Sequence, residues 1–327
     1  RRQRQMCIRD STYTVPGYYR VTLAVWDADR NAGTASVDIS VAADRLLSIS
    51  GTVTAVPNQF TDSDTNNPGA PDGPNDERAD AQEIPRTPTI IGGFAAATPT
   101  GRPGDRFESS ADLVDWYAID LEAGQTVQLA IADWVSADPS RIDFDLFVFD
   151  AASGSLFDAS VGDGQFETVQ VAHAGSYLIE VRAIGGFSNY TLSVGATPSA
   201  SSTRELRTSA ALVAGEILVR RGLASKALGV APEPLGFAVV AEGGSDVVLG
   251  RLPPATALKS GGSGAASPVT ALGPGAEGLS DEQREKLRTL YEVKRLRARA
   301  DVDHAEPNYV VHPTLTPDDP RYPTQWH

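Results

Sequence analysis

The chain has 327 residues, more than a single domain usually holds, and its 41% hydrophobic content is enough to build packed cores. Its formal net charge of −14 argues against a nucleic-acid partner, which would need clustered basic residues, and no apolar run approaches the length that spans a membrane. The 30 Gly and 22 Pro residues indicate many turns, as in beaded all-β proteins, and the acidity suits a soluble extracellular protein.

The first eleven residues differ sharply in composition from the rest. They hold four Arg, one Asp and the single Met and single Cys of the chain, Met6 and Cys7. We interpret residues 1–11 as a leading segment foreign to the protein, such as translated adapter sequence; the alternative is a genuine basic segment. Without them the chain has no Cys, which excludes disulfides and cysteine-ligated metal sites.

Residues 12–56 are predicted to end an all-β module. The segment 18–26 alternates apolar and polar side chains, a turn follows at 27–33, and 34–41 alternates again. The pattern P-G-Y-Y-x-V-T-L-x-V-x-D-x-D-x-N resembles the last hairpin of PKD-type, immunoglobulin-like repeats. Two strands cannot bury a core, so this module is expected to be truncated.

Residues 57–88 form an acidic connector rich in Pro, Gly and Asn. Within it Asp62, Asp64 and Asn66 place oxygen ligands at alternate positions, as a calcium loop does. The rest of the EF-hand pattern fails, because its glycine and its bidentate glutamate are missing from their positions. The sequence therefore favours a solvated linker, with calcium bound by these three residues as the alternative.

Residues 89–195 are predicted to form a β-sandwich, because short strand patterns recur with turn signals between them. The segments D-W-Y-x-I-x-L-x-A-G-Q-T-V, D-L-x-V-F-D-A-x-S-G and A-G-S-Y-L-I-E-V-R resemble the bacterial pre-peptidase C-terminal (PPC) domain of secreted proteases. In that family the domain usually follows the catalytic domain, so a copy ahead of one departs from the common order. Trp116 and Tyr117 are neighbours in one strand, so one of them is expected to lie exposed at the rim.

Two further polar features of this segment are expected to be structural. Asp143 and Asp145 share a strand face with Phe147 and could act as an acid/base pair or a calcium site. Such residues at the start of a strand usually face water, and we adopt that interpretation. His173 has no Cys or second His near it in the sequence, which favours a surface turn over a metal ligand.

Residues 196–211 form a linker of small residues, and residues 212–312 have a different pattern. That pattern predicts strands at 215–220, 237–240, 246–252 and 306–311, a short helix at 224–228, a low-complexity excursion at 253–278 and a longer helix after it. Ser280 and Gln283 form a capping box that marks the start of the longer helix. The order β-α-β-β-α-β is that of the ferredoxin-like split unit. The predicted fold class is therefore mainly β with a smaller α+β domain, a PPC-like β-sandwich followed by a ferredoxin-like domain.

The end of the chain carries the strongest functional signal. A V-x-x-A-E-P-N-Y segment ends at Tyr309, and after a proline-rich run the chain closes with D-P-x-Y-x-x-Q-W-H. These motifs resemble the junction between the propeptide and the catalytic domain of secreted subtilisin-like serine proteases (subtilases), and G-E-I-L-V-R resembles the first propeptide strand. The resemblance implies that residues 212–312 are a propeptide with the ferredoxin-like fold and that 313–327 open the catalytic domain.

The same resemblance implies how this part would act. Subtilase propeptides fold onto their protease, template its folding and leave their tail in the active-site cleft as a product-like inhibitor. The tail here would be Tyr309, Val310, Val311 and His312, added as a strand to the substrate-binding edge of the enzyme. The implied partners are the chain's own subtilisin-like catalytic domain and, for the parent enzyme, its protein substrates.

The chain is thus expected to be the non-catalytic N-terminal region of a secreted subtilisin-like serine endopeptidase. The catalytic Asp, His and Ser would follow His327, so no catalytic residue is assigned, and no cofactor is expected apart from possible calcium. One alternative is an extracellular β-sandwich adhesin that binds polysaccharide or matrix, which residues 12–195 would suit but the tail would not. The other is a free-standing inhibitor of propeptide type, which has no need of the proline-rich run after His312.

Overall fold

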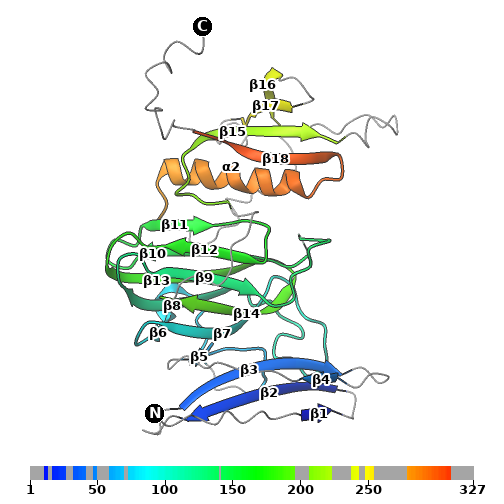
Figure 1. Cartoon of the computed structure of the whole chain (residues 1–327), viewed down its shortest axis with the longest axis vertical. Coiled ribbons are helices and arrows are strands. Elements are labelled where there is room, and N and C mark those ends of the chain that lie inside the picture. Colours follow the sequence, from blue (N-terminus) through cyan, green and yellow to red (C-terminus); the bar gives the residue numbers. More distant parts are fainter. Residues whose placement is uncertain are drawn as a thin grey trace, which may run out of the picture. The chain divides into compact units, whose positions relative to one another are not determined.

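The computed structural model describes residues 11–13, 17–26, 32–41, 47–49, 59–69, 73–139, 141–195, 206–222, 237–242, 247–253 and 278–310. They fall in two compact units, Arg1–Glu205 and Leu206–His327 (Figure 1). Some predicted features lie outside the described residues: the basic segment up to residue 10, the short helix at 224–228, most of the excursion at 253–278, Val311, His312 and the segment 313–327.

The N-terminal segment forms the expected antiparallel hairpin. β2 (Gly17–Trp26) pairs with β3 (Ala32–Val41) along its whole length. β1 (Ser11–Tyr13) pairs with β4 (Leu47–Ile49) in a separate two-stranded sheet. The alternating pattern therefore located both long strands, and the second begins two residues earlier than expected.

The larger part of this unit contains two five-stranded sheets (Figure 1). One sheet has the strand order β11-β10-β13-β8-β6, and the other has the order β12-β9-β14-β7-β5. The strands are β5 (Gln59–Thr61), β6 (Gln82–Ile84), β7 (Thr89–Ala96), β8 (Val114–Leu121), β9 (Thr126–Ile131), β10 (Asp143–Asp150), β11 (Leu156–Ser160), β12 (Phe166–Gln170), β13 (Gly175–Gly185) and β14 (Phe187–Val194). A 3-10 helix, η1 (Arg78–Asp80), precedes β6. The mainly β character agrees with the prediction of a sandwich.

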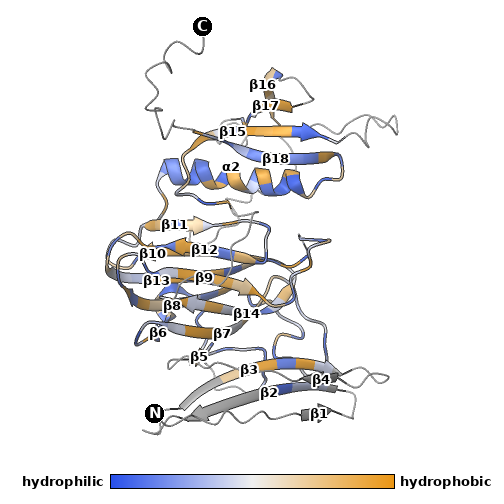
Figure 2. Cartoon of the chain, in the orientation of Figure 1, coloured by the Kyte–Doolittle hydropathy of each residue, from blue (hydrophilic) through white to orange (hydrophobic). Residues whose placement is uncertain are grey.

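Alternation along the strands sends one set of side chains into the space between the sheets. β10 turns Phe144, Leu146 and Val148 inward, and all three are completely buried. They belong to one apolar cluster to which both sheets contribute, and Figure 2 shows hydrophobic segments on strands of each. Burying one such side chain is worth about 1.5–3 kcal/mol, so this cluster is the main source of stability in the sandwich.

Part of the predicted linker belongs to the sandwich. β5 pairs in parallel with β7, and β6 pairs in parallel with β8, so residues from 57–88 supply an edge strand to each sheet. The interpretation of this segment as solvated is wrong for Asp62, Asp64 and Asn75, whose side chains are buried. Each edge strand has only three residues, too few to show the alternation that reveals longer strands.

The prediction that Trp116 or Tyr117 is exposed is also wrong. The two side chains point to opposite faces of β8, yet only 3% of Trp116 and none of Tyr117 is exposed. Trp116 packs against Phe149, with ring centroids 5.3 Å apart, and the Arg78 guanidinium lies 5.0 Å over its ring. The outer face of this sheet therefore has its own packed layer, to which the segment around η1 contributes.

The second unit is an antiparallel sheet with a helix packed against two of its strands. The elements are β15 (Leu212–Arg221), β16 (Ala238–Glu242), β17 (Val247–Arg251), α2 (Asp281–Arg297) and β18 (Val302–Tyr309). The strand order is β16-β17-β15-β18, and α2 contacts β15 and β18. One face of α2 carries completely buried apolar side chains at every third position: Leu287, Leu290, Val293 and Leu296. Hydrophobic and hydrophilic residues therefore alternate along the helix in Figure 2.

The start of α2 confirms the predicted capping box. The Ser280 hydroxyl accepts the Gln283 backbone N–H at 3.2 Å, and the Gln283 side chain accepts the Ser280 N–H at 2.9 Å. The last strand spans 302–309 rather than 306–311. Pro307 therefore lies inside the strand. A proline is tolerated there because β18 is an edge strand, and a residue on its open side needs no N–H donor.

Candidate metal centre

Asp62 and Asp64 follow β5 directly and lie inside the sandwich. Only 3% of Asp62 and 1% of Asp64 is exposed. The Asp62 backbone N–H donates to the Gly92 carbonyl at 2.9 Å, so the pairing of β5 with β7 fixes where the loop leaves the sheet. Asn66 is the third residue of the predicted calcium set. Its side-chain oxygen accepts the Phe107 N–H at 3.1 Å and anchors the loop.

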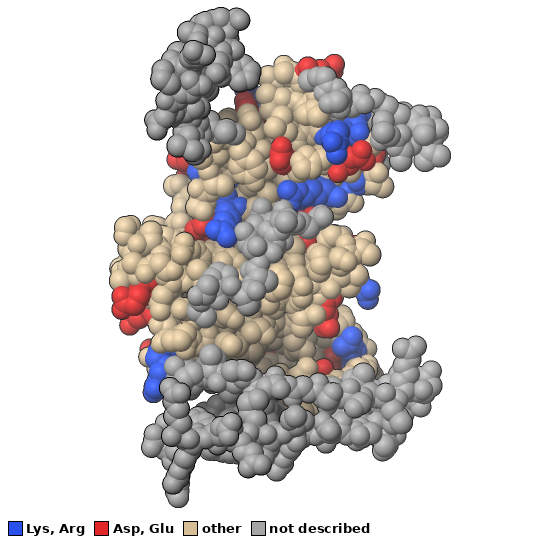
Figure 3. All heavy atoms as spheres, viewed as in Figure 1, with Lys and Arg blue, Asp and Glu red and all other residues tan. Residues whose placement is uncertain are grey.

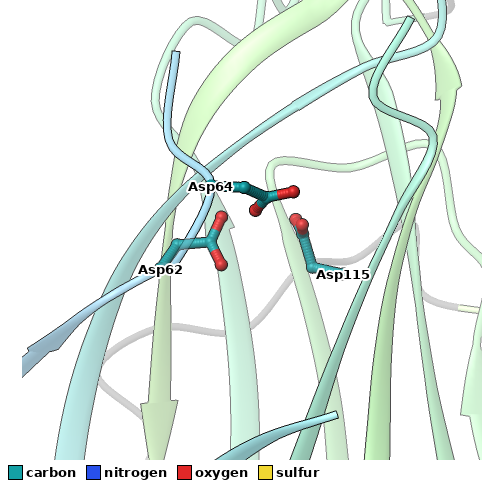
Figure 4. A group of neighbouring side chains, drawn as sticks. All are labelled: Asp62, Asp64 and Asp115. Atoms are coloured by element: carbon teal, nitrogen blue, oxygen red, sulfur yellow. The ribbon is translucent and has the colours of Figure 1, made fainter. Parts of the chain in front are cut away.

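Asp115 reaches the same place from the opposite sheet. It is the second residue of β8 and is completely buried. One carboxylate oxygen from each of Asp62, Asp64 and Asp115 lies within 4.8 Å of the other two. Figure 4 shows the three side chains pointing toward one another. Because β5 and β8 belong to different sheets, this group links the two layers of the sandwich.

Neutral side chains hold the loop that follows β5. The buried Asn75 amide donates to Asp62 Oδ1 at 3.2 Å and to the Trp116 carbonyl at 3.2 Å. Gln82 on β6 accepts the backbone N–H of Ser63 at 3.1 Å. These contacts position the loop while occupying only one oxygen of the Asp62 carboxylate.

A buried pair of tyrosines lies behind Asp115. The Tyr190 hydroxyl donates to Asp115 Oδ2 at 2.6 Å, and the Tyr117 hydroxyl lies 2.5 Å from that of Tyr190. The Tyr190 ring rests against Gly93, where an added Cβ would lie 2.2 Å from the ring. Glycine at position 93 therefore leaves room for Tyr190 to reach Asp115. The Tyr190 hydroxyl orients the Asp115 carboxylate through Oδ2, and Oδ1 accepts no hydrogen bond.

A second acidic group shares Asp64 with the first. One carboxylate oxygen from each of Asp64, Asp76 and Asp112 lies within 4.8 Å of the other two. Asp112 is 2% exposed and exchanges two backbone hydrogen bonds with Ala96, at 2.9 and 2.6 Å, whereas Asp76 is exposed. The Arg106 guanidinium lowers the pKa of all three carboxyls, so it lies near this group.

Burial and repulsion between neighbouring carboxylates raise the pKa values of these groups by more than the Arg106 guanidinium lowers them. For Asp62 and Asp115, burial is the main cause of a strongly raised pKa, and the neighbouring carboxylates add to it. The same two causes raise the pKa of Asp112 to about 9. Burial likewise raises the pKa of Asp64 and Asp76. The charged forms of these groups are therefore unfavourable unless further positive charge is brought close to them.

The oxygens left without hydrogen bonds allow a test of whether a cation fits. They are five buried carboxylate atoms: Asp62 Oδ2, Asp64 Oδ1, Asp112 Oδ1, Asp112 Oδ2 and Asp115 Oδ1. Burying an anionic oxygen without a partner is costly, and metal coordination removes that cost. A donor set made only of oxygens suits a hard cation such as Ca²⁺, and two oxygens bound to one Ca²⁺ lie at most about 5 Å apart. The spacings within both groups meet this limit.

The acidity of this centre is mostly hidden from the surface. On the face that Figure 3 draws, acidic side chains of the described residues are scattered among basic ones. Four of the five carboxylates in the two groups are instead buried: Asp62, Asp64, Asp112 and Asp115. Four of the acidic residues that count toward the formal net charge therefore lie in the interior.

The other candidate residues of the sandwich lie outside these groups. Asp143 and Asp145 are 6% and 0% exposed, so the expectation that they face water is wrong. They lie on β10, which is flanked by β11 and β13 inside its sheet rather than at an edge. His173 is exposed in a turn, as predicted, and its carbonyl accepts the Tyr177 hydroxyl at 2.8 Å.

The predicted inhibitory tail is described only at its start. Tyr309 and Val310 are 38% and 41% exposed at the end of β18. The Val310 N–H donates to the Ala211 carbonyl at 2.8 Å, which keeps the chain beside the start of β15 at this point.

Sequence reasoning found Asp62 and Asp64 but missed Asp76, Asp112 and Asp115. Asp115 opens the D-W-Y segment, and an acidic residue at the start of a mostly apolar strand was a signal that could have identified it. Asp112 and Asp76 carry no comparable signal, because each lies in an irregular polar stretch.

Comparison with known families identifies the central part of the sandwich. Residues 113–183 match the model of the family described as "Bacterial pre-peptidase C-terminal domain", so the chain contains a PPC domain there. The match begins just before β8, includes Asp115 and ends in β13. PPC domains are typical of the N-terminal or C-terminal regions of secreted bacterial proteases.

The other comparisons add little. No curated protein matches the chain. Among solved structures, the chain is similar to PliG of Aeromonas hydrophila, a periplasmic inhibitor of g-type lysozyme, with 16% identity and a TM-score of 0.23. That similarity covers 35% of this chain and 94% of the inhibitor, and it is too weak to carry a functional inference. Within the described ranges, no helix is both long and apolar enough to cross a membrane.

Proposed function

We propose that this chain is a non-catalytic region of a secreted bacterial protease, in which a cation-bound PPC sandwich precedes a propeptide-like unit. The observation that carries the first part is the convergence of Asp62, Asp64 and Asp115, each with a buried oxygen that accepts no hydrogen bond. The PPC match at 113–183 supports the protease context. The PKD-like origin of residues 12–56 stays a prediction.

Ca²⁺ is the cation that the chemistry of this first group favours. Ca²⁺ accepts irregular sets of six to eight oxygens, whereas Mg²⁺ requires a near-ideal octahedron, which a loop and a strand do not readily supply. Bound by Asp62, Asp64 and Asp115, the cation would neutralise carboxylates that burial makes unfavourable. It would also connect the loop after β5 to β8, and so hold the two sheets together.

Terbium luminescence tests this assignment on the full chain. Tb³⁺ occupies Ca²⁺ sites, and its emission is sensitised by tyrosines at short range, here Tyr117 and Tyr190 beside Asp115. We expect sensitised emission that Ca²⁺ displaces and that Asp115→Asn abolishes. The matched control, Glu122→Gln, removes an exposed carboxylate just beyond the other end of β8 and should leave the emission intact. Equal emission from the two variants would overturn the assignment.

For the second unit we propose the role of a subtilase-type propeptide. The order β16-β17-β15-β18 supports a split β-α-β-β-α-β unit, in which the first and third strands are central and the others form the edges. The A-E-P-N-Y residues lie at the end of the edge strand β18. The tail formed by Tyr309, Val310, Val311 and His312 would add a strand to the cleft of the chain's own catalytic domain, and backbone hydrogen bonds would supply the affinity.

Inhibition of a subtilisin-type protease by the full chain tests this second role. We expect the added chain to inhibit, and replacement of residues 309–312 by Gly and Ser to remove the inhibition. The same replacement at four residues within 253–278 should leave inhibition unchanged. Because the chain supplies no nucleophile of its own in this proposal, it should not react with a fluorophosphonate probe. Undiminished inhibition after the tail replacement would contradict the proposed mode.

The gene provides an independent test of the protease context. An Asp-Thr-Gly or Asp-Ser-Gly motif soon after the codon for His327 would support a subtilisin-like catalytic domain. A reading frame that continues without such a motif would remove it. The alternative, an extracellular adhesin, would instead predict retention on polysaccharide or matrix together with no inhibition of proteases.

A further inference from the structure

We propose that a groove on the outer face of one sheet of the sandwich binds an uncharged sugar unit of a polysaccharide. The sheet is the one with the order β12-β9-β14-β7-β5, and β5, β7 and β14 line the groove together with β3 of the hairpin. All four strands belong to the same compact unit, Arg1–Glu205. The groove has a volume of about 270 Å³, just below the roughly 300–1,000 Å³ of sites for drug-sized molecules, so it suits a ligand as small as a sugar unit.

A glycine keeps the floor of the groove open. Gly92 on β7 pairs directly with Thr191 on β14, and both residues are exposed. A Cβ added at Gly92 would meet nothing within 4 Å in the part of the chain that the structure describes. The absence of a side chain at position 92 therefore leaves space for a small ligand to approach the backbone of the sheet.

Three side chains of the groove can form hydrogen bonds with such a ligand. Asn189 and Thr191 alternate along β14 with the core residues Tyr190 and Leu192, so both point to the outer face. Both line the groove, as does Thr61 on β5. Among the described residues, none forms a hydrogen bond with the side chains of Asn189, Thr191 or Thr61. Amide and hydroxyl groups can both donate and accept, which matches the hydroxyl groups of a sugar.

Asp133 adds an acceptor to the groove, just after β9. Its backbone is held against β14: the Ala132 N–H donates to the Asn189 carbonyl at 3.0 Å, and the Asp133 N–H donates to the Ser188 hydroxyl at 3.0 Å. Asp133 is therefore anchored next to Asn189, and it is exposed to the groove. A carboxylate that accepts beside an amide that also donates suits neighbouring hydroxyl groups of one sugar ring.

The charges around the groove disfavour an anionic ligand. Arg20 on β2 donates to the two carboxylate oxygens of Asp38 on β3, at 2.8 and 2.9 Å, and to the Thr65 hydroxyl at 3.1 Å. These contacts engage all three guanidinium nitrogens and tie the hairpin wall to the loop after β5. The three charged residues that line the groove, Arg20, Asp38 and Asp133, sum to one negative charge. A phosphate or a sulfated glycan would therefore find a committed guanidinium and a repelling carboxylate.

Apolar side chains complete the lining. Phe60, Ile90 and Val37 all line the groove, and half of the Val37 side chain is exposed. Small-molecule sites typically combine apolar surface with a few oriented polar groups. A sugar has hydroxyl groups around its ring and apolar C–H groups on the ring faces, so it matches both parts of this lining.

Titration calorimetry of the full chain with soluble sugars tests the proposal. We expect at least one of cellobiose, maltose and N,N′-diacetylchitobiose to bind, and a sulfated heparin disaccharide not to bind. Gly92→Val should abolish binding, because the valine fills the floor of the groove. Asp133→Ala should weaken binding about tenfold or more, because a hydrogen bond to a charged group is lost. The matched control is Ser193→Val, on the same face of β14 but outside the groove, and it should bind like the wild-type chain.

A second variant guards against a folding defect. Valine is a favourable residue in strands, so Gly92→Val should fold, and its thermal unfolding checks this. Thr191→Ala removes only a hydroxyl from the groove and should also weaken binding. Sugar binding that survives in a folded Gly92→Val variant would overturn the site, and so would a wild-type chain that binds none of the three sugars. If an unstructured casein peptide binds instead and Gly92→Val abolishes that binding, the groove is a peptide site and the proposal fails.

The sugar site can fail independently of the cation and propeptide assignments, which are tested by terbium emission and by protease inhibition. Sugar binding and protease inhibition by one chain would mean that the sandwich holds the parent enzyme at a polysaccharide surface. Sugar binding without inhibition would support the site but assign it to an extracellular adhesin.

Discussion

The acidic group buried in the sandwich and two paired carboxylates of the second unit have opposite electrostatic surroundings. In the sandwich, carboxylates converge in the interior, and burial raises their pKa. In the second unit the pKa values of Glu216 and Asp301 are lowered instead, mainly by hydrogen bonds from Arg251 and Arg299 respectively. Both of those carboxylates lie near the surface, where water and a matched guanidinium already satisfy them.

This difference indicates what each unit needs in order to fold. The second unit combines an apolar helix face with paired surface charges, and neither feature requires a ligand. The sandwich has a larger apolar cluster but also contains buried carboxyl oxygens that accept no hydrogen bond. Removing an ion should therefore affect one unit and leave the other unchanged.

Chelation of Ca²⁺ should have the largest effect and should destabilise only the sandwich. At free Ca²⁺ a thousandfold above its Kd, one bound ion stabilises the folded state by about 4 kcal/mol. Hydrogen exchange of the full chain in Ca²⁺ and in EDTA should show lost protection in peptides from 59–195. Peptides from 206–222 and 278–310 should exchange equally in both conditions. Equal losses in both units would refute the contrast.

Leu287→Ala should destabilise the second unit and leave the sandwich unchanged. Leu287 is completely buried on α2, and truncating such a leucine costs about 2–5 kcal/mol. The loss of protection should be confined to the second unit and should be the same with and without Ca²⁺. Val239→Ala on β16, where half of the side chain is exposed, is the control and should cost well under about 1 kcal/mol. A Ca²⁺-dependent cost for Leu287→Ala would mean that the units are coupled.

The contrast also shows which parts of the molecule the sequence could predict. Long periodic segments such as β2, β3 and α2 were located well, because their apolar spacing is a local property. The edge strands β5 and β6 were missed, because three residues are too few to show a period. The shift of β18 had another cause, since proline is compatible with an edge strand.

The candidate metal centre depends on contacts that no local pattern encodes. Asp62 and Asp64 could be found from their spacing, but Asp115 joins them only because β5 and β8 place their ends together in opposite sheets. The contact of Asn66 could not be predicted for the same reason, because Phe107, whose N–H its side chain accepts, is far away in sequence. Sequence spacing therefore indicated the loop that carries two of the carboxylates, but only the fold shows which others converge with them.

In the metal-free protein, the stability of the sandwich should fall as pH rises. The buried carboxyls have pKa values above their unfolded ones, so the folded state binds more protons and loses stability as those protons leave. The decline should begin near pH 4 and continue toward the pKa of about 9 of Asp112. Saturating Ca²⁺ should abolish or reverse this slope. Thermal unfolding in EDTA across that range measures it, and a metal-free sandwich that gains stability with pH would contradict the assignment of these pKa shifts.

Ser280→Ala should have the smallest effect and gives the finest test that the second unit folds independently of the cation. The substitution removes the hydroxyl that accepts the Gln283 N–H at the start of α2, and losing such a cap costs about 1 kcal/mol. Ser280→Asp should restore most of it, because a carboxylate can accept the same N–H and interacts well with the positive end of the helix dipole. Hydrogen exchange in the first turn of α2 should report the change, with identical differences in Ca²⁺ and in EDTA. If Ser280→Asp fails to recover protection, the cost of Ser280→Ala arises from something other than the lost cap. If that cost depends on Ca²⁺, the two units do not fold independently.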